Sequence, residues 1–244
     1  KIFISQMFSL QALKEAGRAH GATLNDVMMT MIAGVIQKYL KLRNMEMGPK
    51  DRVTFMVAMN CRVTKITECI DETSFGNKSN SVVCPVPVHI DDTLQRLEAV
   101  KKEMHRIKSS LLGTAFKFLE SFNNLIPKSK ALSEDAVDMI SGKMYSAFQK
   151  HALISNIPGP TNKLTVSGLQ VQSLHGVLSL PNTFVPFSYA GELGVSYVAD
   201  SYHVPDGEYI IKLLEAEIKK FLDLHYPSSK NIHSINNGVT ISSY

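Results

Sequence analysis

Apolar residues recur at three- or four-residue intervals in two stretches near the start of the chain, which is the spacing of one helix face. In residues 9–19 this spacing predicts a short helix, and His20-Gly21 behind it is a common helix end. Residues 22–44 keep a period near 3.6 and predict a long helix that buries a broad face. Its apolar positions are Val27, Met28, Met31, Ile32, Val35, Ile36 and Leu40.

Runs of β-branched and alternating apolar residues predict strands in the rest of the chain. They lie at residues 1–5, 53–59, 81–88, 151–155, 163–166, 168–178, 184–190 and 193–200. Further amphipathic helices are predicted over residues 92–111, 114–126, 133–149 and 206–224. Pro85 and Pro87 favour an edge position for their strand, because proline removes a ladder donor. The elements follow no strict βαβ rhythm, so we predict an α/β (α+β) fold in which helices cover a mixed β-sheet.

Composition places the chain among globular proteins. Its 244 residues, 44% hydrophobic and 20% charged, suffice for a sizeable core. We predict one folded unit over residues 1–226 and an irregular tail over residues 227–244. The net charge of +4 is dispersed and no basic stripe carries interleaved aromatic residues, so we expect no nucleic-acid partner. Cys61, Cys69 and Cys84 form no CxxC pair, which favours reduced thiols in a cytosol-facing protein.

Motifs of the common enzyme classes are absent from the sequence. It contains no GxSxG, Walker, GxGxxG or HExxH pattern, and its eight histidines lack metal-ligand spacing. We therefore expect neither a metal nor a resident cofactor. Asp91 and Asp92 precede a predicted helix, so a helix cap explains them better than an acid–base pair with His89.

Two polar stretches are not fully explained by cap and turn chemistry. In TLND, residues 23–26, the threonine and the aspartate fit a capping box, whereas Asn25 has no part in it. In SNIPGP, residues 155–160, the prolines and the glycine predict that a strand stops near Asn156 and that the chain turns away. Asn156 then bonds its own loop, or it is held on a rigid element at a functional seam.

Four blocks of the sequence together resemble one protein family. They are GATLNDVMMTMIAGVIQKYL at 21–40, FGNKSNSVVCPVPV at 75–88, LISNIPGP at 153–160, and PFSYAGELGVSYVAD with VPD within 186–206. In content and order they resemble the C-terminal domain of the wax ester synthase/diacylglycerol acyltransferase family, over nearly all of residues 1–224. That family belongs with the CoA-dependent acyltransferases, whose fold resembles chloramphenicol acetyltransferase and whose two similar halves enclose a tunnel. The resemblance implies that this chain forms one half of such a two-domain fold.

The resemblance implies an O-acyltransferase that makes wax esters or triacylglycerol from acyl-CoA. In the family, the second histidine of a His-His-x-x-x-Asp-Gly motif in the N-terminal half is the general base, and this chain has no two adjacent histidines. We therefore expect no catalytic residue here and a catalytic half upstream, which the strand-like start at Lys1 favours. The alternatives are a catalytically silent lipid-binding or scaffold module, and a related acyltransferase that loads a polyketide or peptide product.

The implied partners are the missing N-terminal half, acyl-CoA as co-substrate, and a long-chain alcohol or diacylglycerol as acceptor. This half would supply substrate-binding residues along the tunnel. They are Asn25, Asp26, Ser155, Asn156, Pro158, Gly159, Ser188 and Tyr189. Met28, Met29 and Met31 either line the tunnel as an adaptable lipid surface or belong to the core.

Lipid substrates imply peripheral attachment at the cytosolic face of the endoplasmic reticulum, the plasma membrane or a lipid droplet. No apolar run reaches the ~20 residues that a membrane-spanning helix needs. The predicted helix at Thr114–Pro127, with Phe116, Phe118 and Phe122, is the candidate membrane contact. A core helix is the alternative.

Overall fold

A mixed β-sheet forms the centre of the computed structural model, which describes residues 1–60, 79–109 and 151–226. The strands of the sheet are β1 (Ile2–Ile4), β2 (Phe8–Ser9), β3 (Val53–Asn60), β4 (Ser79–Val86), β5 (Ala152–Ile154), β6 (Ile157–Pro158), β9 (Thr183–Tyr189) and β10 (Glu192–Val198). They lie in the order β1-β10-β9-β5-β3-β4, with β2 beside β10 and β6 beside β9. The strands β3, β5 and β9 are parallel neighbours, whereas β4, β10, β1 and β2 pair antiparallel.

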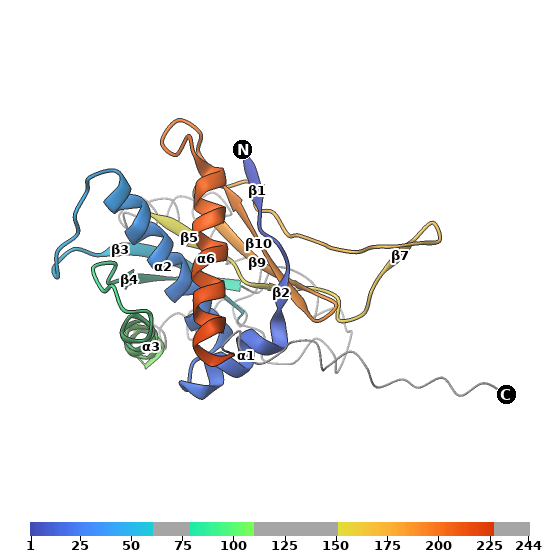
Figure 1. Ribbon diagram of the computed structural model, residues 1–244, viewed down its shortest axis with the longest axis horizontal. Coiled ribbons are helices and arrows are strands. Elements are labelled where there is room, and N and C mark those ends of the chain that lie inside the picture. Colours follow the sequence, from blue (N-terminus) through green and yellow to red (C-terminus); the bar gives the residue numbers. More distant parts are fainter. Residues whose placement is uncertain (61–78, 110–150, 227–244) are drawn as a thin grey trace, which may run out of the picture.

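Helices cover one face of this sheet (Figure 1). The described helices are α1 (Leu10–Ala19), α2 (Leu24–Leu42), α3 (Thr93–Ser109) and α6 (Gly207–His225). The helix α2 packs against the other three, while α3 also contacts β4 and α6 also contacts β1 and β10. This arrangement confirms the predicted fold class of a mixed sheet covered by helices. No described helix is long and apolar enough to span a bilayer.

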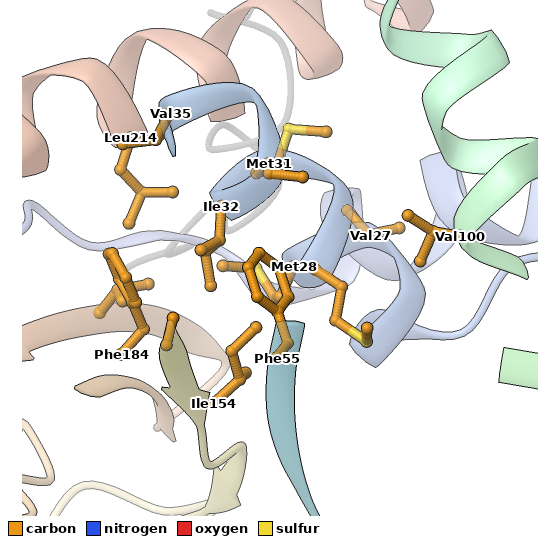
Figure 2. Close-up of a cluster of buried hydrophobic side chains, with 14 of the residues drawn as sticks. Val27, Met28, Met31, Ile32, Val35, Phe55, Val100, Ile154, Phe184 and Leu214 are labelled. Atoms are coloured by element: carbon orange, nitrogen blue, oxygen red, sulfur yellow. The ribbon is translucent and has the colours of Figure 1, made fainter. Parts of the chain in front are cut away.

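The core lies between α2 and the strands β3, β5 and β9. Figure 2 shows Met28 and Ile32 above Phe55 of β3 and Ile154 of β5, with Phe184 of β9 beside them. The side chains of Met28, Met29 and Met31 are all fully buried, so these methionines belong to the core. The hypothesis that they line a lipid surface is wrong, because the sheet, α3 and α6 take up the space around α2. Burying each such side chain contributes about 1.5–3 kcal/mol to stability.

A buried polar cluster joins three of the helices. The Arg96 guanidinium of α3 donates to Gln37 Oε1 of α2 at 2.9 Å and to Glu217 Oε2 of α6 at 3.3 Å. The second Glu217 oxygen pairs with Lys38 at 2.6 Å. Gly34 makes room for this cluster, because a Cβ there would lie 2.3 Å from the guanidinium. The helices therefore meet through a satisfied ionic network as well as through apolar packing.

Most predicted elements are confirmed by the structure. The helices at 9–19, 22–44, 92–111 and 206–224 correspond to α1, α2, α3 and α6, and Asp92 caps α3 by accepting from the Gln95 amide at 2.8 Å. The strand β4 ends the strand order, as its prolines indicated. The predicted helices at 114–126 and 133–149 and the tail at 227–244 lie outside the described residues.

The predicted long strand at 168–178 is wrong. A short hairpin stands there instead, made of β7 (Thr165–Val166) and β8 (Leu169–Gln170) and turned by Ser167 and Gly168, both at positive φ. This hairpin forms the end of a segment, residues 160–182, that extends away from the body of the fold (Figure 1); we call it the arm. The arm's residues after Gln170 form no strand: the Val171 amide donates to the Leu164 carbonyl at 2.9 Å, and further along the Gly176 carbonyl accepts from the Ser196 hydroxyl of β10.

Candidate functional site

Three parallel strands end at the same edge of the sheet and set the place of the candidate site. The central strand β5 pairs in parallel with β3 on one side and with β9 on the other. Parallel neighbours bring their carboxyl ends together, and the crevice beyond those ends is where open α/β sheets bind ligands. The SNIPGP stretch continues β5 at this edge, and Ser188 and Tyr189 end β9 there.

The strand β5 ends at Ile154, close to Asn156 as predicted, but the chain does not turn away there. Leu153 pairs with Thr183 in β5, and Pro158 pairs with Ser188 in β6, so pairing with β9 resumes in the same register. The Ser155 amide donates to the Phe184 carbonyl at 3.0 Å and bridges the two short strands. Proline occurs in sheets at edges, strand ends and bulges, and β6 is a two-residue strand with β9 as its described neighbour. What ends after Ile154 is the pairing with β3, and Asn156 lies just past that point.

The N-terminus of α2 contributes the second part of the site. Thr23 caps the helix: its hydroxyl accepts from the Asp26 amide at 3.3 Å, and Asp26 Oδ2 accepts from the Thr23 amide at 2.8 Å, which confirms the predicted capping box. The Asp26 side chain is buried, and its Oδ1 has no hydrogen-bond partner within the described part of the chain. Asn25 takes no part in the box, as the sequence indicated.

Asn25 instead meets Asn156. The Asn156 Nδ2 donates to Asn25 Oδ1 at 2.7 Å, a contact across 131 positions of sequence. Both side chains are half-buried. Among the described residues, neither the Asn25 amide nitrogen nor the Asn156 side-chain oxygen makes a further hydrogen bond, so each retains capacity for a ligand. The proximity expected for a functional seam is therefore confirmed, and a loop asparagine that bonds only its own turn is not what the structure has.

Gly159 and Ser188 continue the site along β9. The Gly159 amide donates to Ser188 Oγ at 3.2 Å. A Cβ at Gly159 would lie 2.2 Å from the Ser188 carbonyl oxygen and 2.4 Å from the Phe187 ring. The backbone passes so close to β9 that glycine is required at this position. Ser155 is buried beside the same strands, and Pro158 is exposed at their end.

Tyr189 anchors the arm at the end of β9. Its ring is fully buried, and its hydroxyl accepts from the Leu164 amide at 2.8 Å while it donates to the Val171 carbonyl at 2.9 Å. Both legs of the arm are thereby tied to one side chain. The structure explains Tyr189 by this anchoring, and its predicted contact with substrate stays a prediction. No local pattern in the sequence indicates this anchor, because Tyr189 and its two partners lie far apart along the chain.

His175 is a residue near the site that the sequence did not single out. It lies on the returning leg of the arm, against Gly194 of β10, where a Cβ would be 2.4 Å from its ring. Burial lowers the pKa of the imidazole, and its Nδ1 has no hydrogen-bond partner in the described ranges. A lone histidine without a motif carries no local signal that sequence reasoning can use. The described residues also contain no group of three or more histidine, cysteine, aspartate or glutamate side chains that could hold a metal ion.

The fold is that of solved acyltransferases and condensation domains. The wax ester synthase/diacylglycerol acyltransferase of Marinobacter aquaeolei superposes on 92% of this chain with a TM-score of 0.61 and 17% identity, using 49% of its own length. The polyketide synthase associated protein 5 of Mycobacterium tuberculosis superposes on 92% of this chain with a TM-score of 0.55 and 14% identity, over 52% of that chain. These matches define the fold and confirm the expected likeness.

The sequence places the chain within this class. The profile of the WS/DGAT C-terminal domain matches residues 75–221, more than half of the chain, and the chain belongs to that family. It is 25% identical over 223 residues to the O-acyltransferase WSD of Acinetobacter baylyi, and the aligned part covers 90% of this chain and 46% of that protein. It is also 25% identical over 227 residues to a probable diacylglycerol O-acyltransferase of Mycobacterium tuberculosis, covering 88% and 46%. The chain thus spans about half the length of these relatives.

Proposed function

We propose that this chain is the tunnel-forming C-terminal half of an acyl-CoA-dependent O-acyltransferase, which esterifies a long-chain alcohol or diacylglycerol to a wax ester or triacylglycerol. Its relatives are named for O-acyltransferase activity, and they are about twice as long as the aligned part. The missing half would contribute the general base. Both substrates and the product are lipids or carry lipid chains, so the enzyme would work at a membrane or lipid-droplet surface, which flotation with liposomes tests.

The contact between Asn25 and Asn156 carries this proposal. It places two amide groups at the N-terminus of a long helix and just past the carboxyl end of β5, the central one of three parallel strands. Both features favour a negatively polarised oxygen, because strand-end crevices bind ligands and a helix N-terminus has positive partial charge. The mutual hydrogen bond fixes both amides before substrate arrives, which is the preorganisation that oxyanion stabilisation needs.

The reaction would proceed as follows. A histidine of the other half removes the proton from the acceptor hydroxyl, and the oxygen attacks the thioester carbonyl of acyl-CoA. The carbonyl oxygen becomes an oxyanion, which the amide of Asn25 or Asn156 stabilises by donating a hydrogen bond. The carbon–sulfur bond then breaks, and CoA leaves as a thiolate that takes the proton back from the histidine.

Direct transfer without an acyl-cysteine fits the described residues. Cys84 is fully buried, and burial raises the pKa of its thiol to about 12. A thiol in that state is a poor nucleophile at neutral pH. The cysteines Cys61 and Cys69 lie outside the described residues. The acyl group would therefore pass from CoA to the acceptor in one addition and elimination.

The arm is the candidate contact with the missing half. Its root is fixed by the Tyr189 hydroxyl, while Leu164, Val166 and Leu169 on it are 41%, 61% and 77% exposed. Apolar side chains on a projecting hairpin cost solvation free energy unless a partner covers them. The aligned part covers only 46% of a relative such as the O-acyltransferase WSD. The other half of the same polypeptide would therefore be the partner that covers these side chains.

Alanine substitutions in the protein encoded by the whole gene test the proposal. We expect Asn25→Ala and Asn156→Ala each to lower kcat by about 100-fold, and the double variant to lose little more, because the two amides act as one unit. Thr23→Ala is the stability control, since it removes the cap of the same helix end at a cost of about 1 kcal/mol and leaves both amides in place. If Asn25→Ala and Asn156→Ala lower kcat no more than Thr23→Ala does at a similar loss of melting temperature, the two amides are structural and the proposal fails.

A catalytically silent lipid-binding module is the second candidate function. It is favoured by one observation, the lack of two adjacent histidines in this sequence. The two candidates differ in the upstream coding sequence. A His-His-x-x-x-Asp-Gly motif there supports the transferase, whereas a gene without it supports the silent module.

A further inference from the structure

Two histidines from distant parts of the chain meet at the ends of two helices. His20, the C-cap of α1, places its Nε2 2.7 Å from the Nε2 of His225 in the last turn of α6. The ring centroids are 4.9 Å apart and the rings stand at 83° to each other. Both side chains are half-buried, so solvent reaches the pair. This pair lies outside the candidate acyl-transfer site and has no part in the proposed reaction.

The other nitrogen of His225 fixes its tautomer. Its Nδ1 lies 2.9 Å from the Phe221 carbonyl oxygen, which only accepts hydrogen bonds, so Nδ1 carries the proton. In the neutral ring, Nε2 then presents its lone pair toward His20. Histidine ligands of metal ions are held in this way, with the second ring nitrogen donating to a carbonyl or a carboxylate.

We propose that His20 and His225 form a binding site for a divalent first-row transition metal ion, with Zn²⁺ as the reference ion. The ligand class follows from the donors, because imidazole nitrogen suits zinc, copper, nickel and cobalt, whereas magnesium and calcium prefer oxygen. Two zinc–nitrogen bonds of about 2.1 Å at the tetrahedral angle set the nitrogens about 3.4 Å apart. The observed 2.7 Å therefore has to open by about 0.7 Å, which small side-chain rotations supply.

The metal would take the place of the hydrogen bond between the rings. The proton on His20 Nε2 moves through water to Nδ1 of the same ring, which stays neutral, and both Nε2 lone pairs then bind the ion. No third histidine, cysteine, aspartate or glutamate joins the pair within the described part of the chain, so water completes the coordination. Two charged groups on the neighbouring elements are engaged: Lys101 of α3 donates to the His20 carbonyl, and Glu15 of α1 accepts from Tyr226 at 3.0 Å.

Such an ion would tie α6 to the connection between α1 and α2. His20 directly precedes the residues that lead into Asn25, and His225 is near the end of the described chain. The ion would thus link two segments 205 positions apart in sequence. Binding to the folded state alone raises its stability, with a roughly 100-fold fall in the unfolding constant when free metal is 100 times its Kd.

Zinc titration of the 244-residue chain tests this site. We expect isothermal titration calorimetry to give one Zn²⁺ per chain and thermal unfolding to move upward with ZnCl₂ but not with MgCl₂. His20→Gln and His225→Gln should each abolish the high-affinity event and the zinc-induced shift. Glutamine retains hydrogen-bonding capacity and size, so these variants are expected to fold, and the shift is measured against each variant's own metal-free midpoint.

Two other histidine variants serve as controls. His105→Ala removes an exposed histidine of α3, and His203→Ala removes the ring that pairs with Asp200 at 2.7 Å. Both should bind zinc as the unaltered chain does. A zinc-induced shift that persists in His20→Gln and His225→Gln, or that disappears in His203→Ala instead, would overturn the assignment. Absence of any zinc binding to the unaltered chain would overturn it as well.

Discussion

Gly159 is the point where the chain after β6 passes closest to β9. Its amide donates to the Ser188 hydroxyl, and its α-carbon faces the Ser188 carbonyl and the Phe187 ring. The Phe187 ring is packed between Gly159 and Gly176 on the returning leg of the arm, where a Cβ would be 2.7 Å from it. The packing of one aromatic ring between two glycines therefore fixes the path by which the arm leaves the sheet.

Gly159→Ala should destabilise the fold by about 2 kcal/mol, since the added methyl meets backbone and a packed ring rather than a flexible side chain. Urea unfolding followed by circular dichroism measures this change. Gly48→Ala is the matched control, because a Cβ there meets Asp51 at an ordinary 3.5 Å. Equal midpoints for the two variants would show that the arm relaxes away from β9 at no cost.

At the scale of elements, α2 connects the core to the candidate site. It is buried on nearly all sides, its N-terminus carries Asn25, and its middle meets α3 and α6 through Gln37, Arg96 and Glu217. Removing a charge from such a buried cluster leaves a partner unpaired in low dielectric, which costs far more than losing an exposed pair. The three helices should therefore depend on Glu217 for their packing.

Glu217→Gln should lower the free energy of unfolding by about 3 kcal/mol, because Arg96 and Lys38 both lose their carboxylate. The same substitution at Glu208 is the control, since that residue pairs with Lys212 on the exposed face of α6. We expect Glu208→Gln to leave the urea midpoint unchanged. A Glu217→Gln midpoint that matches the control would show that the ionic network contributes nothing net to stability.

Elements with local signals could be predicted from the sequence, and those set by distant contacts could not. The spacing of apolar residues in α2 and the capping box of Thr23 and Asp26 depend only on residues close together in the sequence, and both predictions are confirmed. The two-residue strand β6 was missed because its pairing partner, not its own proline-rich sequence, makes it a strand. The long strand predicted at 168–178 was wrong because alternating residues also occur in a projecting hairpin.

The candidate site shows the same limit. Asn25 was recognised as unexplained because the capping box uses its neighbours and leaves it out. Its contact with Asn156 joins residues 131 positions apart, so no local pattern could predict it. Both residues were selected as site candidates because they lie in blocks that resemble the family. Tyr189 was assigned to substrate on that resemblance alone, whereas its anchoring of Leu164 and Val171 depends on the folded arm.

At the scale of the whole molecule, the two-half proposal rests on the Asn25–Asn156 contact and on the arm. The amides of Asn25 and Asn156 lie at a sheet edge, and the arm beside them exposes apolar side chains. A tunnel needs a second wall, and the chain spans about half of relatives such as the O-acyltransferase WSD. Under the proposed function, the second wall comes from the part of the polypeptide that this chain does not span.

We expect the 244-residue chain by itself to show no transfer from palmitoyl-CoA to a long-chain alcohol or diacylglycerol, and the protein encoded by the whole gene to show it. The reason is the general base: the family's motif needs two adjacent histidines, which this sequence lacks. The alternative base to test is His175, because burial lowers the pKa of its imidazole and so keeps the ring neutral and able to accept a proton. Release of CoA thiol by the purified chain, abolished in His175→Ala, would therefore contradict the two-half assignment and place the base on the arm. Activity that appears only with the upstream half present, and that survives His175→Ala, would place the base in that half.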